Sequence, residues 1–302
     1  MVFDSTRDEN EGFALVAVLV FMLIVSAVVV PFALSARTRL MIASNEMEHD
    51  RLSMVADGLV NVVASELFDG SAVKGVPLDA EPARCRSGHL SFDLRVQDHR
   101  GLIDLNAASD TLLTQGMASF GFDPQKAEEI AKAIVTSRGP PNAFASNIQP
   151  QSSLGPKQNK FAAFESVSEL QEFSALASIP LRDLYDVFTV NLKQGSIVLA
   201  DAPKRLRNVI DGGSHDYQAV GQDKSGGTVY TVEIAARRDG SGVTGQAGLV
   251  VEKSSLMAAG FRRVSRMPAV ETDDGGPTPL VPTASCDLFF GSGVAQILAR
   301  WS

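Results

Sequence analysis

The hydrophobic pattern of the chain opens on one uninterrupted apolar run, from Phe13 to Ala36. Its 24 residues carry no charge and are bounded by Glu11 on one side and by Arg37 and Arg39 on the other. A helix rises about 1.5 Å per residue and the hydrocarbon core of a bilayer is about 30 Å thick, so about 20 such residues span it. A cleaved secretory signal has a shorter apolar region, and no Ala-x-Ala-like site clearly follows this run. The pattern therefore predicts a transmembrane segment.

A helical repeat of apolar positions continues beyond this run to Phe68. Leu40, Met47 and Met54 recur at seven-residue intervals, and other apolar residues fall between them at spacings of three and four. Charged residues occupy many of the remaining positions, which is typical of a helix with one apolar stripe. An Asp-Gly pair then ends the pattern. We predict a single helix from Phe13 to Phe68 whose second half packs on a folded body.

Alternating apolar and polar residues mark strands on both sides of a helical region. Such alternation is typical of half-buried strands of an antiparallel sheet. The predicted strands are His89–Val96, a short strand at Leu102–Leu105, Thr228–Arg237, Gln246–Lys253 and Gly260–Met267. We predict an α+β fold in which residues 37–106 and 192–302 form the body and residues 107–191 form an all-helical insertion.

Capping signals support the helices of this insertion. Asp123 precedes Pro124, which suits the first position of a helix. Ser166 and Glu169 have the spacing of a capping box. The predicted helices are Thr111–Phe120, Pro124–Ser137, one after Ser166, and Leu181–Phe188, and the Pro-, Asn-, Gln- and Ser-rich stretch Gly139–Lys160 is predicted to be a loop.

The charge balance argues against binding to nucleic acid. The chain of 302 residues has a formal net charge of −8, and its apolar content of 45% is ample for a core. Within residues 107–191, six basic residues stand against nine acidic ones. The turn at Ser178–Pro180 lacks the glycines, and the region lacks the basic flanks, that phosphate-binding hairpins use. No nucleic-acid partner is expected.

Two local patterns suggest enzyme chemistry but lack its context. Gly240–Gly245 has the GxGxxG spacing of dinucleotide-binding loops, yet it lies between two predicted strands, so we interpret it as a hairpin loop. Asp98 and Asp104 are interpreted as turn and strand-surface residues in preference to a catalytic pair. The histidines, His49, His89, His99 and His215, share no helical spacing for zinc ligands. The sequence predicts a protein that is not an enzyme.

The chain has two cysteines, Cys85 and Cys286. They form one disulfide bridge if the body lies in an oxidising compartment, or they remain two unpaired buried thiols. The sequence leaves both alternatives open.

The residues before the apolar run form a further pattern. A polar leader, residues 1–12, ends in Gly12, and the hydrophobic Phe13 follows. This pattern resembles the type IV pilin-like proteins, and the resemblance implies that a membrane prepilin peptidase cuts after Gly12 and methylates the amine of Phe13. The fifth residue after this cut is Ala17, where most pilins carry a glutamate that neutralises the terminal ammonium of the adjacent subunit. Type II secretion system protein K characteristically lacks this glutamate.

Two other segments resemble protein K. Asp98–Asn106 is similar to the acidic-Gly-apolar-Leu-Asn segment that precedes the helical insertion of that family. Ala127–Arg138 together with Phe164–Leu170 resembles a helix-hairpin-helix or sterile-alpha-motif-like unit. The resemblance implies a pilin-like α+β fold with a long N-terminal transmembrane helix, an antiparallel sheet and this helical insertion.

The resemblance implies a minor pseudopilin at the tip of the type II secretion pseudopilus, which initiates or caps filament assembly for protein export across the outer membrane. The implied partners are the other minor pseudopilins, the major pseudopilin, the prepilin peptidase, the inner-membrane secretion platform and the lipid bilayer. The implied location is the bacterial inner membrane, with a single span and a periplasmic C-terminal body. The acidic leader favours the reverse orientation by the positive-inside rule. A minor pilin of a type IV pilus and a membrane-tethered helix-hairpin-helix DNA-uptake protein are the alternatives.

The resemblance also raises calcium as a cofactor, because members of the family bind it. Acidic residues near turns, among them Asp273, Asp274 and Glu165, carry the oxygen donors that calcium prefers. The family's ligands do not map onto this sequence residue by residue, and solvated loop acids are the favoured interpretation. Calcium is a candidate cofactor without an assigned site.

Overall fold

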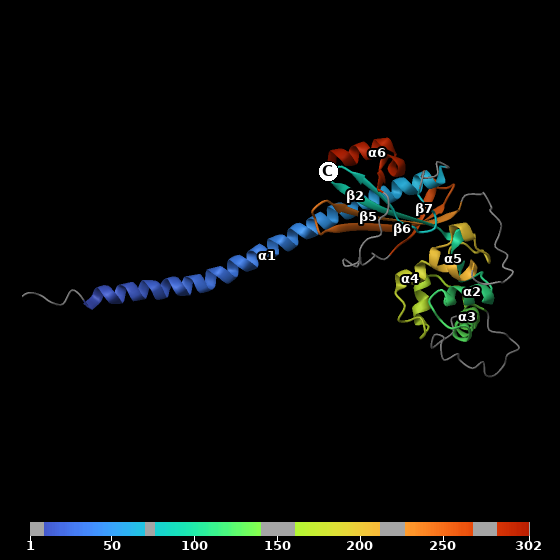
Figure 1. Ribbon diagram of the computed structural model, residues 1–302, viewed down its shortest axis with the longest axis horizontal. Helices are drawn as coiled ribbons and strands as arrows, with labels where there is room; N and C mark the ends of the chain where they lie inside the picture. The colour runs from blue at the N-terminus through green and yellow to red at the C-terminus, as the bar shows by residue number, and fades with distance from the viewer. Residues whose placement is uncertain (1–8, 70–75, 140–160, 212–226, 268–282, 302) are drawn as a thin grey trace, which may run out of the picture. The chain divides into compact units, whose positions relative to one another are not determined.

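The computed structural model describes residues 9–69, 76–139, 161–211, 227–267 and 283–301. The chain divides into two compact units, Met1–Arg51 and Leu52–Ser302. Its elements are mixed helices and strands, with a long apolar helix first and an antiparallel sheet after it (Figure 1). This arrangement fits a pilin-like α+β fold.

The helix α1, Glu9–Phe68, is continuous over 60 residues. It ends at the predicted residue and begins at Glu9, inside the predicted leader, rather than at Phe13. Pro31 lies within it, where the ring removes one backbone hydrogen bond. At its end the amide of Asp69 donates to the carbonyl of Ser65 over 3.0 Å, which closes the last turn.

A six-stranded sheet belongs to the second unit, with the strand order β7-β6-β5-β2-β1-β8. Neighbouring strands are antiparallel except β1 and β8, which are parallel. The strands are β1 (Ala83–Ser87), β2 (Leu90–Asp98), β5 (Val229–Arg238), β6 (Thr244–Lys253), β7 (Phe261–Arg266) and β8 (Thr283–Ser285). The four strands predicted from long alternating patterns, β2, β5, β6 and β7, are confirmed, whereas β1 and β8 are not among the predicted elements.

The Gly240–Gly245 motif lies at the hairpin between β5 and β6, as predicted. Gly240 has a φ of 73°, which glycine adopts without strain. Gly245 lies against the backbone of α1 at Leu52, and a side chain there would collide with that backbone. The glycines of the motif therefore serve a turn and a close helix–sheet approach.

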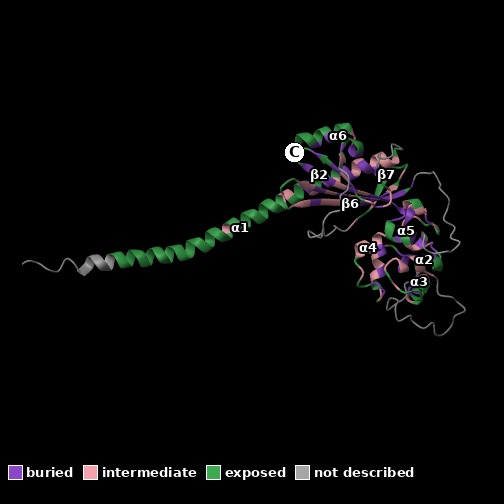
Figure 2. Ribbon diagram, in the orientation of Figure 1, coloured by how far each residue is buried: buried purple, intermediate pink, exposed green. Residues whose placement is uncertain are grey.

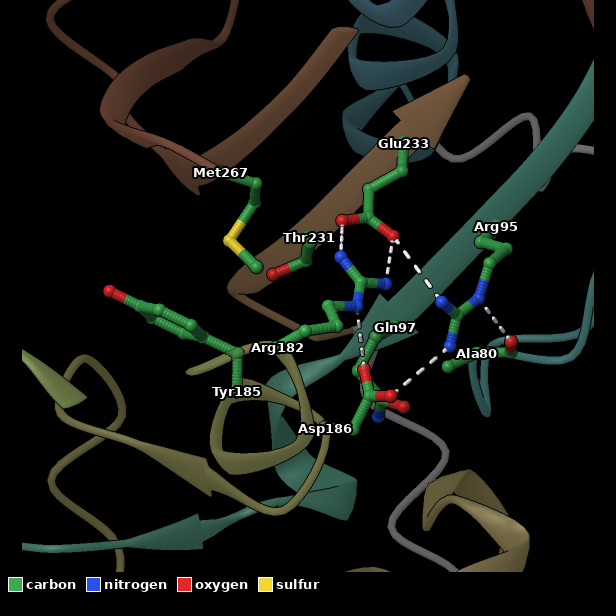
Figure 3. A pocket seen from close by; sticks show the side chains of 9 residues that line it. All are labelled: Ala80, Arg95, Gln97, Arg182, Tyr185, Asp186, Thr231, Glu233 and Met267. Atoms are coloured by element: carbon green, nitrogen blue, oxygen red, sulfur yellow. Dashed lines mark hydrogen bonds and ion pairs between the residues drawn. The ribbon is translucent and has the colours of Figure 1, made fainter. Parts of the chain in front are cut away.

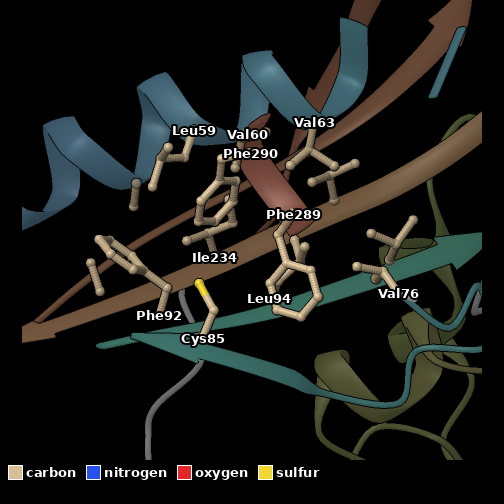
Figure 4. Packing of buried hydrophobic residues seen from close by; sticks show 14 of the residues in the cluster. Leu59, Val60, Val63, Val76, Cys85, Phe92, Leu94, Ile234, Phe289 and Phe290 are labelled. Carbon is tan, nitrogen blue, oxygen red and sulfur yellow. The ribbon is translucent and has the colours of Figure 1, made fainter. Parts of the chain in front are cut away.

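The part of α1 that belongs to the second unit packs on the sheet and closes a first hydrophobic core (Figure 4). Its buried residues recur at helical spacing and are Leu52, Ala56, Leu59, Val60, Val63 and Ala64. They meet Phe92 and Leu94 of β2 and Ile234 of β5. Met54, which the seven-residue spacing placed in the apolar stripe, is instead 67% exposed. The observed stripe therefore excludes Met54, whereas Leu59 and Val63, which belong to the predicted helical repeat, are buried in it.

The helix α6, Asp287–Trp301, contributes Phe289, Phe290 and Leu298 to the same core. It is not among the predicted elements. Gly291 interrupts it with a φ of 76° and a ψ of 156°, which are not helical values. Because Gly291 divides the helix, the apolar residues on each side of it form segments too short to show a helical repeat in the sequence.

A second hydrophobic core lies in the helical part of this unit. Its helices are α2 (Asp110–Ala118), α3 (Pro124–Arg138), η2 (Val167–Glu172), α4 (Leu181–Tyr185), η3 (Leu199–Asp201) and α5 (Lys204–Asp211), and η1 (His99–Gly101) leads into it from β2. The prediction of an all-helical insertion is not confirmed, because β3 (Ile103–Asp104) and β4 (Phe188–Thr189) pair as parallel strands. The core also continues past residue 191, since Leu206 and Ile210 belong to it.

The predicted caps of this part are confirmed. Asp123 accepts a hydrogen bond from the amide of Lys126 at 3.0 Å. Ser166 and Glu169 form both halves of the capping box, although the helix that they cap is a short 3-10 helix. Residues 140–160 of the predicted loop lie outside the described residues.

Candidate functional site

The first candidate site is the apolar surface of α1. Each residue from Leu15 to Ser35 is exposed (Figure 2). Within the described ranges, this is the one helix long and apolar enough to cross a membrane, and no part of its most apolar stretch is buried. An apolar surface of this size is unfavourable in water. The helix fits a single-pass membrane anchor.

The predicted processing residues lie near the beginning of this helix. Gly12 and Phe13 are both helical. Ala17, the fifth residue after the predicted cut, is exposed on the same apolar surface. Cleavage after Gly12 stays a prediction.

A disulfide joins Cys85 of β1 to Cys286, the residue before α6. Both cysteines are buried in the first core. Because their sequence separation is 201 residues, the bond closes a loop that contains the whole helical part. It ties the segment that carries α6 to the sheet.

The second candidate site is a polar layer where the helical part meets the sheet. His99 of η1 is buried, with Nδ1 at 2.7 Å from the hydroxyl of Thr189 in β4 and Nε2 at 2.8 Å from that of Thr231 in β5. Burial lowers the pKa of His99 from 6.5 to about 3. The neutral imidazole therefore bridges one strand of each part, since it can donate through one nitrogen and accept through the other.

Arg100 joins two carboxylates next to this histidine. Its guanidinium lies 3.0 Å from Asp98 and 3.2 Å from Asp201 of η3. Asp98 is fully buried, and burial raises its pKa from 3.8 to about 6, although the amide and side chain of Arg100 oppose the shift. Burial likewise raises the pKa of Asp201. One arginine thus neutralises an acid of the sheet and an acid of the helical part.

A ring of four charges forms a second link in this layer (Figure 3). Arg182 of α4 binds Glu233 of β5 through two guanidinium nitrogens and lies 3.4 Å from Asp186. Arg95 of β2 lies 3.5 Å from Asp186 and 3.8 Å from Glu233. Two residues of the ring come from the sheet and two from the α4 region, so its charges alternate in sign across the contact.

The ring lines a cavity of about 10 Å³, which has room for about one water molecule. Gln97 also lines it, and the side-chain amide nitrogen of Gln97 donates to the carbonyls of Asp98 and Asp201 at 2.5 and 2.9 Å. These two bonds fix the amide, and Gln97 Oε1 accepts no hydrogen bond from any described residue. A cavity of this size suits a structural water and is too small for an organic substrate.

The prediction that Asp98 and Asp104 lie on turn and strand surfaces is wrong, because both are buried. Asp104 accepts hydrogen bonds from the amides of Asn106, Leu192 and Lys193 at 2.8 to 3.0 Å. These amides hold the carboxylate and connect the segment after β3 to residues 192 and 193. A carboxylate that accepts several amide hydrogen bonds needs no cation to stabilise its charge. The sequence pattern misses this because the helical part covers positions that alternation alone leaves exposed.

Candidate metal and catalytic residues do not converge in the described part of the chain. There, no group of three or more His, Cys, Asp or Glu side chains could hold a metal ion. Glu165 lies beside the capping box, where its amide donates to Glu169. His215, Asp273 and Asp274 lie outside the described residues. This arrangement can hold two folded parts together through charge. Calcium is still a candidate cofactor without an assigned site.

No family model matches the sequence, and no curated protein matches it. Among solved structures, the fold is similar to a chain of the GspK–GspI–GspJ complex of the type 2 secretion system from enterotoxigenic Escherichia coli. The TM-score is 0.46 and the identity 8%, over 77% of this chain and 98% of that one. A likeness at these values does not establish a shared family or a shared function.

Proposed function

We propose that this chain is a minor pseudopilin, anchored in the membrane and placed at the tip of a type II secretion pseudopilus. The main support for the proposal is that α1 combines an exposed apolar part with a part that packs in the core of the body. Its apolar surface is exposed from Leu15 to Ser35, and from Leu52 onward its side chains build the core under an antiparallel sheet. One helix thus supplies a membrane anchor and the spine of a folded body, as a pilin-like subunit requires.

The proposal includes the processing step. Residues 1–12 are the leader, a prepilin peptidase removes it after Gly12 and methylates Phe13, and residues 13–36 store the mature chain in the bacterial inner membrane. The predicted body, residues 37–106 and 192–302, is periplasmic and carries the predicted insertion, residues 107–191, whose hydrophobic core extends to Ile210. The major pseudopilin, the other minor pseudopilins and the inner-membrane secretion platform are the proposed partners.

The tip position rests on two features. Ala17 replaces the glutamate that an interior subunit of a filament uses to neutralise its neighbour's ammonium, and a subunit with no neighbour ahead of it has no such charge to neutralise. The second core adds bulk to the sheet, and this bulk obstructs the addition of a further subunit. In this position the protein initiates or caps the filament and needs no catalytic group.

N-terminal mass spectrometry of the membrane-extracted protein tests the proposal. The mature chain should begin with methylated Phe13. A Gly12→Val variant should keep its first twelve residues, whereas the matched Glu11→Gln variant should be processed as the natural chain is. An intact leader in the natural protein, or a chain from which the whole apolar run has been removed, would overturn the proposal.

A further inference from the structure

Polar and charged side chains connect the helical part of the second unit to the sheet. Besides the polar layer described above, Arg207 of α5 binds Asp79, and the ammonium of Lys204 lies 2.9 Å from the carboxylate of Glu81. Asp79 and Glu81 precede β1, and Asp79 forms an isolated bridge with Gln97 of β2. Among the described residues, no buried apolar residue belongs to both hydrophobic cores. Each part therefore has its own core, and charges and hydrogen bonds link the two.

The chain passes from the sheet into the helical part at His99. Just before it, Asp98 is the last residue of β2 and pairs with Tyr230 of β5. Just after it, the carbonyl of Arg100 accepts a hydrogen bond of 2.7 Å from the amide of Val198 in the helical part. The return passage, between α5 and β5, lies outside the described residues. At the described passage, the backbone is thus fixed to the sheet before His99 and to the helical part after it.

The packing at this boundary is incomplete. The cavity of about 10 Å³ lies within it, and Gln97 Oε1 accepts no hydrogen bond there from any described residue. Some apolar surface is nevertheless covered. Val250 and Val229 are buried, and both lie on the face of the sheet that His99 contacts, because Val250 pairs with Thr231 and Val229 precedes Thr231 by two residues. Separation at this boundary uncovers these two side chains and the polar layer but opens neither core, so the closed arrangement is favoured without being the one folded arrangement.

We propose that the second unit contains a hinge at His99, about which the helical part moves away from the sheet as one folded body. Hinges are often a few residues at the end of an element, and they absorb a change in backbone angles. The ring of four charges and the link through Arg100 hold the closed form. In the open form, water solvates these side chains and both cores stay intact.

The hinge concerns the second unit alone and does not rest on the proposed function. In a subunit that assembles with others, it lets the helical part adopt the orientation that a neighbouring subunit requires. The processing experiment on Gly12 and the experiment below test different parts of the chain, so either proposal can fail while the other stands.

Two spin labels, one on the sheet and one on the helical part, measure this movement in the full chain in detergent micelles. The two natural cysteines are joined in a disulfide, so Leu256→Cys and Gln125→Cys supply the thiols that react with nitroxides. Leu256 is 94% exposed in the turn between β6 and β7, and Gln125 is exposed in the first turn of α3. Pulsed electron paramagnetic resonance should give one main distance when the boundary is unchanged, because the closed form dominates.

Arg182→Met removes one positive charge from the ring and keeps most of the apolar stem of the side chain. Glu233 and Asp186 then share Arg95 as their remaining partner in the ring. These acids lack a counter-charge in the closed form and are solvated in the open form, so the ratio of open to closed molecules should rise about tenfold or more. A second distance should appear, while the backbone amides of α3 and β5 keep their protection from hydrogen exchange.

Lys132→Met is the matched control, because Lys132 pairs with Glu128 in an exposed contact on α3, and it should leave the distance distribution unchanged. An unchanged distribution in Arg182→Met refutes the hinge. If new distances appear together with a loss of hydrogen-exchange protection in α3, the helical part unfolds and does not move as one body, which also overturns the proposal. If Lys132→Met gives the same new distances, the change does not come from the boundary, and the proposal fails.

Discussion

Lowering the pH from 7 to 5 should weaken the body through His99, and replacing this residue by glutamine should remove that effect. Both imidazole nitrogens are occupied by the hydroxyls of Thr189 and Thr231 in a buried site. Protonation there adds a charge without adding an anionic partner. The folded pKa of His99 is lowered, so its contribution to stability is complete above the unfolded pKa of 6.5 and is lost as the pH falls toward about 3.

The size of the effect follows from the two pKa values. With a pKa of 6.5 in the unfolded chain and about 3 in the folded one, protonation of His99 lowers the free energy of unfolding by about 2 kcal/mol between pH 7 and pH 5. Asp98 acts in the opposite direction, because its folded pKa is raised to about 6 from 3.8. As Asp98 becomes protonated, its contribution raises the free energy of unfolding by about 1 kcal/mol between pH 7 and pH 5.

Urea denaturation of the full chain in detergent micelles, followed by circular dichroism, measures the balance. The natural chain should lose less than about 1 kcal/mol between pH 7 and pH 5, and the His99→Gln variant should gain about 1 kcal/mol. The difference between the two changes isolates the histidine, because Asp98 is common to both. His89→Gln, at a side chain that is 75% exposed, should behave as the natural chain does. Equal pH dependence in the natural chain and the His99→Gln variant would refute the reasoning.

Three further substitutions test other features of the structure. Replacing Cys85 and Cys286 together by serine should lower the free energy of unfolding by up to about 5 kcal/mol, because the bond closes a loop with a separation of 201 residues; an unchanged urea midpoint would contradict this. Glu233→Gln should lower the same quantity by about 2 kcal/mol, because it leaves two partly buried arginines short of a counter-charge. Glu128→Gln removes an exposed pair and should change it by less than about 0.5 kcal/mol, so equal losses in the two variants would disprove a special role for the ring. Ala17→Glu places a carboxylate without a partner in hydrocarbon, at a cost of about 3 kcal/mol, and should reduce the amount of this chain in sheared filaments; undiminished incorporation would argue for an interior position.

The parts of the fold that could be predicted from the sequence are those set by local signals. The end of α1 at Phe68 follows from the Asp-Gly pair after it. The cap at Asp123 and the capping box at Ser166 depend on spacing within a few residues. In β2 and in the second half of β5, buried residues alternate with half-buried ones, as expected of a strand with one buried face. In contrast, β6 buries three consecutive residues, Leu249–Val251, and β7 buries only Phe261.

Elements that depend on partners distant in the sequence could not be predicted from local patterns. β1 and β8 have five and three residues, too few for a periodic signal, and they pair across a sequence separation of about 200 residues. α6 is hidden by the interruption at Gly291. A periodic pattern needs length, and short elements obtain their stability from the sheet that they join.

The polar layer corresponds to a run of polar residues in the sequence, but the strand pattern before this run did not identify it as buried. At its end β2 continues into Gln97, Asp98, His99 and Arg100, a run of polar residues where the strand pattern stops. All of these side chains bond to groups of the layer, and three of them are buried. A cluster of hydrogen-bonding side chains directly after a buried strand looks like a surface turn, because nothing local reveals that α4, η3 and β4 cover it.

The separation into two cores explains how such a chain remains foldable. The first core joins α1, the sheet and α6, and the second joins the helices around α2 and α3. Among the residues that the structure describes, no buried apolar residue belongs to both clusters. Contacts between the parts are instead directional pairs, such as Arg182 with Glu233 and Arg100 with Asp201. Directional pairs fix an orientation but contribute little net stability, so each core must supply most of its own. A helical part built in this way can be changed in size or surface while the core that holds the anchor helix stays intact.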